Sequence, residues 1–192
     1  MEALAVNEIL SLESYEQQRT TIRCRMNALR QLRRLELSDA CVVIFENRET
    51  VQFQVQEMLR VDQSDDADRI ALELSCFNLL IPAKNELSAT LILRIPEYRD
   101  VDHTIKRMQG LTRGCIALMV GDERIPARFD VEDESLLCTG DVFYIHFAFT
   151  DTQIAAFSNP SVAVTLQSCH DHCSARVPIE GETRGSLLKD LL

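Results

Sequence analysis

The chain has 192 residues, of which 46% are hydrophobic and 26% charged, and its side chains give a net charge of -10. This length and composition predict a single folded domain, 1–192, and exclude disordered and low-complexity proteins. No stretch approaches the roughly 20 apolar residues that a membrane-spanning helix needs, so we expect no membrane protein. A phosphate backbone repels acidic proteins, so we expect no nucleic-acid partner.

The N-terminus and the cysteines both indicate a cytoplasmic protein. Glu2, Glu8 and Glu13 stand where a secretory signal would need a basic start and an apolar run. Seven cysteines, an odd number spread from Cys24 to Cys173, do not form the pattern of a disulfide framework. We therefore expect reduced thiols.

The first half of the chain predicts a long N-terminal helix and then an alternation of strands and helices. Residues 9–35 carry apolar side chains at spacings of three and four without Gly or Pro, which indicates an amphipathic helix. The short apolar run at 40–45 predicts a buried strand. The helical period returns at 49–61, and a further helix is expected to reach Phe77, before Pro82.

The second half predicts mainly strands. Residues 87–95 predict a strand and 99–111 a helix, and Gly121 lies at the turn of an expected hairpin over 116–129. The elements expected after it are a strand at 141–149, a helix at 151–157, a strand pair at 162–166 and 175–179, and a helix at 182–192.

These elements mix without a regular βαβ repeat. The expected fold class is therefore α+β, with a mixed, mainly antiparallel sheet, helices packed on it and a long N-terminal helix. Within the single domain we expect an N-terminal helical segment, 1–40, and an α+β core, 41–192. In the strand at 141–149, alternation places four aromatic or aliphatic side chains on the core face: Phe143, Ile145, Phe147 and Phe149.

Arginines concentrate in the first helix. Between Tyr15 and Leu35, six arginines are opposed by Glu16 alone: Arg19, Arg23, Arg25, Arg30, Arg33 and Arg34. One interpretation is a solvated helix face whose arginines pair with the protein's own carboxylates. The other is a docking surface for an acidic partner, with Arg30, Arg33 and Arg34 as the candidate binding residues.

The densest cluster of potential metal ligands is Cys169, His170, Asp171, His172 and Cys173. In an extended chain His170 and His172 would point the same way, about 6 to 7 Å apart at Cα, so both imidazoles could bind one zinc or iron ion. Such sites need three or four ligands, and His146 is the first candidate to complete the set. The alternative is a polar turn whose histidines face water.

Glu57 lies in an otherwise apolar helical pattern and is a further candidate ligand, because buried carboxylates are costly unless they are paired or bind metal. The alternative is an ion pair with Arg48 or Arg60. Signatures of nucleotide-binding proteins, zincins and serine hydrolases are absent from the sequence. The sequence leaves open whether the protein is an enzyme.

Residues 45–60, FENRETVQFQVQEMLR, are specific enough to compare with known families. Six other segments accompany them in order: SLESYEQQR, LELSCFNLLIP, ATLILRIPE, VGDERIPA, TDTQIAAF and DHCSAR. In these segments the whole chain resembles an uncharacterised bacterial family of about this length, a domain of unknown function. Its members are often encoded beside rubrerythrin-like ferritin-fold proteins and iron-sulfur oxidoreductases, which implies an association with redox or iron metabolism.

The chain departs from the family pattern near the candidate ligands. A histidine of the pattern falls on Phe143 and a basic residue on His146, which puts a metal site using His146 in doubt. Asp171 and His172 match the pattern, whereas Cys173 replaces a proline. Among the candidate ligands, the resemblance therefore favours His172.

Two functional hypotheses follow. The first is an accessory or protein-interaction domain that docks on a rubrerythrin-like or iron-sulfur partner through the arginine-rich helix and residues 45–60. The second is a small metal-binding protein or metalloenzyme, with zinc or iron held by Cys169, His170, His172, Cys173 and Glu57.

Overall fold

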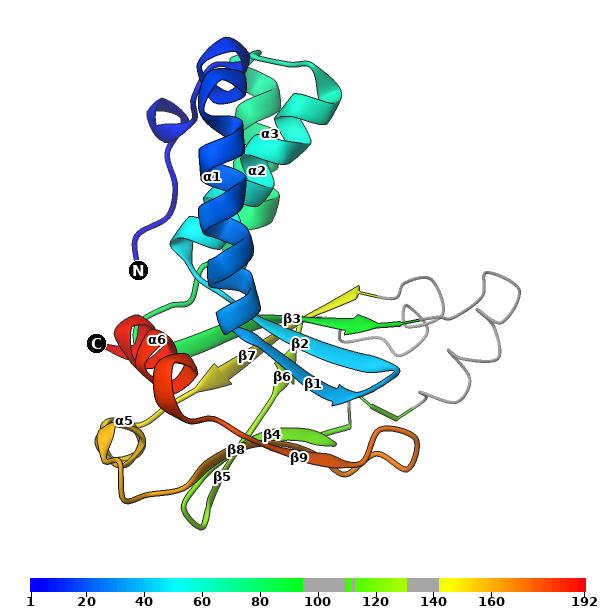
Figure 1. Ribbon diagram of the computed structural model, residues 1–192, viewed down its shortest axis with the longest axis vertical. Coiled ribbons are helices and arrows are strands. Elements are labelled where there is room, and N and C mark those ends of the chain that lie inside the picture. Colours follow the sequence, from blue (N-terminus) through cyan, green and yellow to red (C-terminus); the bar gives the residue numbers. More distant parts are fainter. Residues whose placement is uncertain (95–109, 112, 131–141) are drawn as a thin grey trace.

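The computed structural model describes residues 1–94, 110–111, 113–130 and 142–192. Three helices form a lobe that rises from a pair of β-sheets (Figure 1): α1 (Leu12–Leu32), α2 (Arg48–Asp62) and α3 (Ala67–Phe77). We refer to residues 1–32 and 47–82 as the helical lobe, and to residues 33–46 and the described residues from 83 onward as the β-body. The helical lobe also contains two short 3-10 helices, Val6–Glu8 and Asn78–Leu80.

Side-chain caps fix where the helices of the lobe begin. The Ser11 hydroxyl accepts a hydrogen bond from the Ser14 N–H at the start of α1. At the start of α2, the Asn47 side chain accepts from the Thr50 N–H while the Thr50 hydroxyl accepts from the Asn47 N–H. Such pairs satisfy amide groups that have no partner inside the helix, so they set the first turn.

Nine strands form two sheets in which every pairing is antiparallel among the described residues. The first sheet has the order β1 (Arg34–Ser38), β2 (Cys41–Glu46), β3 (Glu86–Leu93), β7 (Val142–Ala148) and β6 (Arg128–Phe129). The second has the order β5 (Glu123–Pro126), β4 (Ile116–Val120), β8 (Val164–Ser168) and β9 (Ala175–Pro178). Two helices complete the β-body: α5 (Asp151–Ser158) and α6 (Gly181–Leu191).

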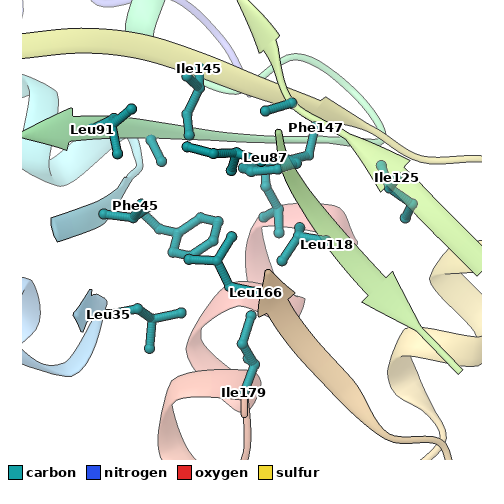
Figure 2. Packing of buried hydrophobic residues seen from close by; sticks show 14 of the residues in the cluster. Leu35, Phe45, Leu87, Leu91, Leu118, Ile125, Ile145, Phe147, Leu166 and Ile179 are labelled. Carbon is teal, nitrogen blue, oxygen red and sulfur yellow. The ribbon is translucent and has the colours of Figure 1, made fainter. Parts of the chain in front are cut away.

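The main core lies between the two sheets. Figure 2 shows side chains of the five-stranded sheet meeting those of the four-stranded sheet, including Phe45, Leu87, Leu91 and Phe147 on one side and Leu118, Ile125 and Leu166 on the other. In β7, Phe143, Ile145 and Phe147 all point into this core, which confirms the predicted aromatic face. The opposite face of the five-stranded sheet is therefore left to face the helical lobe.

The fold class expected from the sequence, α+β with a long N-terminal helix, is confirmed. The expected helix over 9–35 ends at Leu32, because Leu35 and Leu37 alternate into the core as part of β1. The helix expected at 99–111 lies outside the described residues except for 110–111. None of the described helices is long and apolar enough to cross a membrane.

Candidate functional site

A groove of about 520 Å³ lies where the helical lobe meets the outer face of the five-stranded sheet. We refer to it as the interlobe groove. α1 and α2 form its walls, α3 contributes Phe77, and β3 and β7 form its floor. Its apolar surface comes from six side chains: Phe53, Met58, Phe77, Ile92, Val142 and Tyr144.

The register of β3 and β7 explains the apolar floor. Ile92 is directly opposite Val142, and Thr90 is directly opposite Tyr144. Because neighbouring residues of these strands point into the core, all four side chains face outward. Val142 and Tyr144 keep 43% and 37% of their surfaces exposed, so the floor is an open apolar patch.

Two arginines of α1 stand over this floor. Arg23 and Arg30 are seven residues apart, which places them two helical turns apart on the same face. Neither forms a hydrogen bond or an ion pair with the part of the chain that the structure describes. Among the described residues, the interlobe groove therefore offers two arginines without an ion-pair partner beside an apolar surface.

The other four arginines of this region pair with the protein's own carboxylates. Their partners, in chain order, are Glu57 for Arg19, Glu49 for Arg25, Asp190 for Arg33 and Glu36 for Arg34. Each interpretation of the arginine-rich helix therefore holds for some of its residues. Four of the six arginines pair with carboxylates of the same chain, whereas Arg23 and Arg30 form a positive surface open to a partner.

Arg33, a candidate docking residue from the sequence, lies in the interior with no exposed surface. Its Nε donates to the Phe45 carbonyl over 2.8 Å, and one terminal nitrogen donates to the Glu46 carbonyl and the Asp190 carboxylate. The other terminal nitrogen donates to the Ser186 hydroxyl over 3.1 Å. Arg33 therefore joins the end of α1 to β2 and α6 instead of facing a partner.

Glu57 is held on α2 by two residues of α1. The Arg19 guanidinium donates to both carboxylate oxygens, over 2.8 and 2.9 Å, and the Tyr15 hydroxyl donates to one of them over 2.7 Å. The Arg19 contact keeps the pKa of Glu57 at about 2. Burial and Glu57 together raise the pKa of Tyr15. Glu57 therefore links α1 to α2, and the Arg19 guanidinium neutralises its charge.

The groove floor rests on the buried carboxylate of Glu46, which was not among the candidate residues selected from the sequence. Glu46 accepts hydrogen bonds from the Thr50 hydroxyl over 2.5 Å, the Thr90 hydroxyl over 2.7 Å and the Gln54 amide over 3.4 Å. Burial and the nearby Glu46 raise the pKa of Tyr144. The sequence signal is weak, because Glu46 is distinguished only as the last residue of an otherwise apolar strand, directly before a capping Asn.

The Cys/His cluster forms the turn between β8 and β9, and its side chains point in different directions, some into the core and some to solvent. Cys169 and His172 are exposed, whereas His170 and Cys173 are buried. The His170 and His172 rings are 5.9 Å apart, and the His172 N–H donates to Nδ1 of His170 over 3.3 Å. The contact between Cys41 and Cys173 lowers the pKa of Cys173 and raises the pKa of Cys41.

His146 lies on the five-stranded sheet, whereas the Cys/His turn belongs to the other sheet. The Nδ1 of His146 is 3.0 Å from a Glu86 oxygen and its Nε2 is 3.1 Å from an Asp130 oxygen, so each ring nitrogen contacts a carboxylate. Glu57 lies in the helical lobe. Within the described ranges, no three His, Cys, Asp or Glu side chains are grouped so that they could hold a metal ion.

These features define an α+β domain of two antiparallel sheets with a helical lobe and an arginine-walled groove. Residues 3–191 match a family described as proteins of unknown function, DUF3501, and the chain belongs to this family. Its structure is similar to a crystal structure of a novel protein of unknown function from Burkholderia pseudomallei K96243. The TM-score is 0.91, the sequences are 25% identical, and each chain is covered over 100% of its length. A comparison with curated proteins gives no match.

Proposed function

We propose that this protein is an accessory, protein-interaction domain whose interlobe groove binds an acidic and apolar segment of a partner protein. The observation that carries this proposal is the pair of uncompensated arginines, Arg23 and Arg30, beside an open apolar floor. The groove also joins the two segments that the sequence selected for docking, the first helix and residues 45–60. The genomic association of the resembling family supports a redox or iron-related partner in the cytoplasm.

The spacing of the two arginines defines what the segment should contain. Seven helical residues span about 10 Å, and side chains two or four positions apart in an extended peptide point to the same side, about 7 or 13 Å apart. Two acidic side chains at either of these spacings could therefore come within reach of Arg23 and Arg30 together. Because the guanidinium group binds a carboxylate through two parallel hydrogen bonds, Arg suits this role better than Lys would.

The apolar floor supplies the remaining part of the recognition. Met58, Val142 and Tyr144 are exposed in the free protein, and an aromatic or leucine side chain docked against them would remove apolar surface from water. Buried apolar anchors surrounded by charged pairs are typical of protein-protein interfaces. The net charge of -10 on the whole chain disfavours the binding of an acidic segment elsewhere on the surface. The two arginines therefore also determine where on the surface such a segment binds.

A photo-crosslinking experiment in the native cell tests this proposal. A photoreactive phenylalanine analogue placed at Met58 should crosslink one protein through a segment that carries acidic and large apolar residues. Arg23→Glu with Arg30→Glu should reduce the crosslink at least tenfold. A synthetic peptide of the mapped segment should bind the wild-type chain and lose at least tenfold in affinity for the double variant, and more salt should weaken its binding.

Arg25→Glu is the matched control, because Arg25 is exposed on the same helix but does not line the groove. It should leave both the crosslink and the peptide affinity within about twofold of wild type, as expected for a charge outside the interface. A mapped segment without acidic residues, or a crosslink that persists in the double variant, would exclude the proposed mode of docking.

A further inference from the structure

Two cysteines face each other at the end of the ladder between β4 and β8. The last described pair of this ladder is Ile116 with Ser168, in antiparallel register. Cys115 and Cys169 therefore occupy directly opposed positions one step further out. The Cys169 N–H donates to the Cys115 carbonyl over 3.0 Å, which extends the backbone pairing to these two residues.

This position suits a disulfide. The backbone hydrogen bond makes Cys115 and Cys169 a hydrogen-bonded antiparallel pair, in which the Cβ atoms are about 5.5 Å apart, and a disulfide needs about 3.5 to 4.5 Å. A shift of about 1 Å at the end of the ladder would close that difference. Burial raises the pKa of Cys115, and the neighbouring Cys169 thiol raises it further, as expected for thiols on opposed positions.

The two thiols differ in a way that assigns their roles. Cys169 is exposed on the turn, whereas Cys115 is half-buried and its thiol lies 3.3 Å from the Gly110 carbonyl, to which it donates. A solvent disulfide can therefore reach Cys169 first. Cys115 keeps its proton more strongly and is placed to attack in the second step.

We propose that Cys115 and Cys169 form a redox-active dithiol that small disulfides such as oxidised glutathione convert into an intramolecular disulfide. The Cys169 thiolate attacks one sulfur of the small disulfide, the sulfur-sulfur bond breaks, and one small thiolate leaves and takes a proton from water. Cys115 then loses its proton to solvent, and its thiolate attacks the Cys169 sulfur and expels the second small thiol. Two protein thiols are oxidised and one disulfide is reduced to two thiols.

The other four cysteines within the described residues provide internal comparisons. Cys41 and Cys173 also contact each other, but both are buried in the main core, where a small disulfide cannot reach them. Cys24 and Cys76 are exposed on α1 and α3. Accessibility combined with a facing thiol therefore distinguishes the pair Cys115 and Cys169 from these four cysteines.

The test is to incubate the full chain in glutathione buffers of increasing oxidation, alkylate the remaining thiols and map the peptides by mass spectrometry. Two of the seven thiols should be lost together, and a peptide linking Cys115 to Cys169 should form and disappear again on reduction. Cys169→Ser should abolish this link. Cys115→Ser should stop the reaction at one persistent glutathione adduct on Cys169.

Cys76→Ser is the matched control, because it removes an exposed thiol without touching the pair. It should form the Cys115–Cys169 link as wild type does, and melting temperatures will show that each variant is folded. Two results would overturn the proposal. In one, Cys115 and Cys169 both remain alkylated as free thiols in oxidised buffer. In the other, oxidation links either of them to a different cysteine instead.

Discussion

The helical lobe and the β-body both contain ion pairs, but they differ in the size of the apolar core behind them. The β-body has a continuous apolar core that includes side chains of both sheets together with α5 and α6. The helical lobe has a smaller cluster around Val51, Val55 and Leu59, and ion pairs tie its segments together: Arg19 with Glu57, Arg48 with Glu8, and Arg69 with Asp62. The interlobe groove lies where the two meet. Acid and salt should therefore loosen one wall of the groove before they affect its floor.

The largest expected effect comes from the core of the β-body. Phe147 is fully buried between the sheets, and Phe147→Ala should lower the free energy of unfolding by about 3–5 kcal/mol. Val55 is equally buried in the helical lobe, but Val55→Ala removes less volume and should cost about 1–2 kcal/mol. Urea denaturation measures both. A larger loss for Val55→Ala than for Phe147→Ala would contradict the expectation that the core of the β-body contributes more to the free energy of unfolding.

The second prediction concerns Arg33, the first residue of the β-body after α1 ends. Asp190→Ala would leave the Arg33 guanidinium buried without its carboxylate, and we expect a loss of about 3 kcal/mol in urea denaturation. Glu36→Ala is the control, because it removes an exposed carboxylate that contacts the adjacent Arg34. Its effect should be much smaller. Equal effects of the two variants would contradict a structural role for Arg33.

The third prediction is a pH dependence in the helical lobe. The folded pKa of Glu57 is about 2, below its ordinary value of 4.5, so its contribution to stability is complete above pH 4.5 and is lost as the pH falls toward 2. Glu57→Gln should cost about 1 kcal/mol at neutral pH, because the group is partly exposed to solvent. The difference from wild type in urea denaturation should shrink between pH 4.5 and pH 2. A difference that stays constant over this range would exclude the proposed ion pair.

The smallest expected effect is that of salt. At about 1 M salt the screening length falls to about 3 Å, which weakens ion pairs exposed to solvent. Amide hydrogen exchange in α1 and α2 should then become up to about threefold faster, while β2, β3 and β7 change less. Uniform acceleration over both regions would show that the ion pairs do not distinguish the helical lobe from the β-body.

Local patterns predicted most of the elements, because they depend on residues close together in the chain. The alternation of Phe143, Ile145 and Phe147 identified the buried face of β7, and the helical period at 49–61 identified α2. The division of the strands into two sheets could not be predicted in this way. Periodicity shows which face of a strand is buried but does not identify the strand that pairs with it.

Partners that are distant in the chain also limited the prediction of the candidate site. Glu57 was expected either to bind a metal or to pair with Arg48 or Arg60. Arg60 does contact it over 3.7 Å, but its closest partner is Arg19 on another helix. Arg33 looked like an exposed residue because its carboxylate partner, Asp190, is 157 positions away. The groove itself needs α1, α2 and the sheet together, so the sequence could select its segments but not show that they meet.

The pairing of Arg33 with Asp190 also has a consequence for synthesis on the ribosome. At about 5–20 residues per second, the 157 positions between them take about 8–31 s to translate. During that time α1 and the first strands have left the ribosome, but Asp190 has not been made. The Arg33 guanidinium therefore lacks the carboxylate that accompanies it in the interior. Because burying an unpaired charge is costly, the nascent chain cannot close this junction until α6 has been made. Chains interrupted before that point would remain open to proteases.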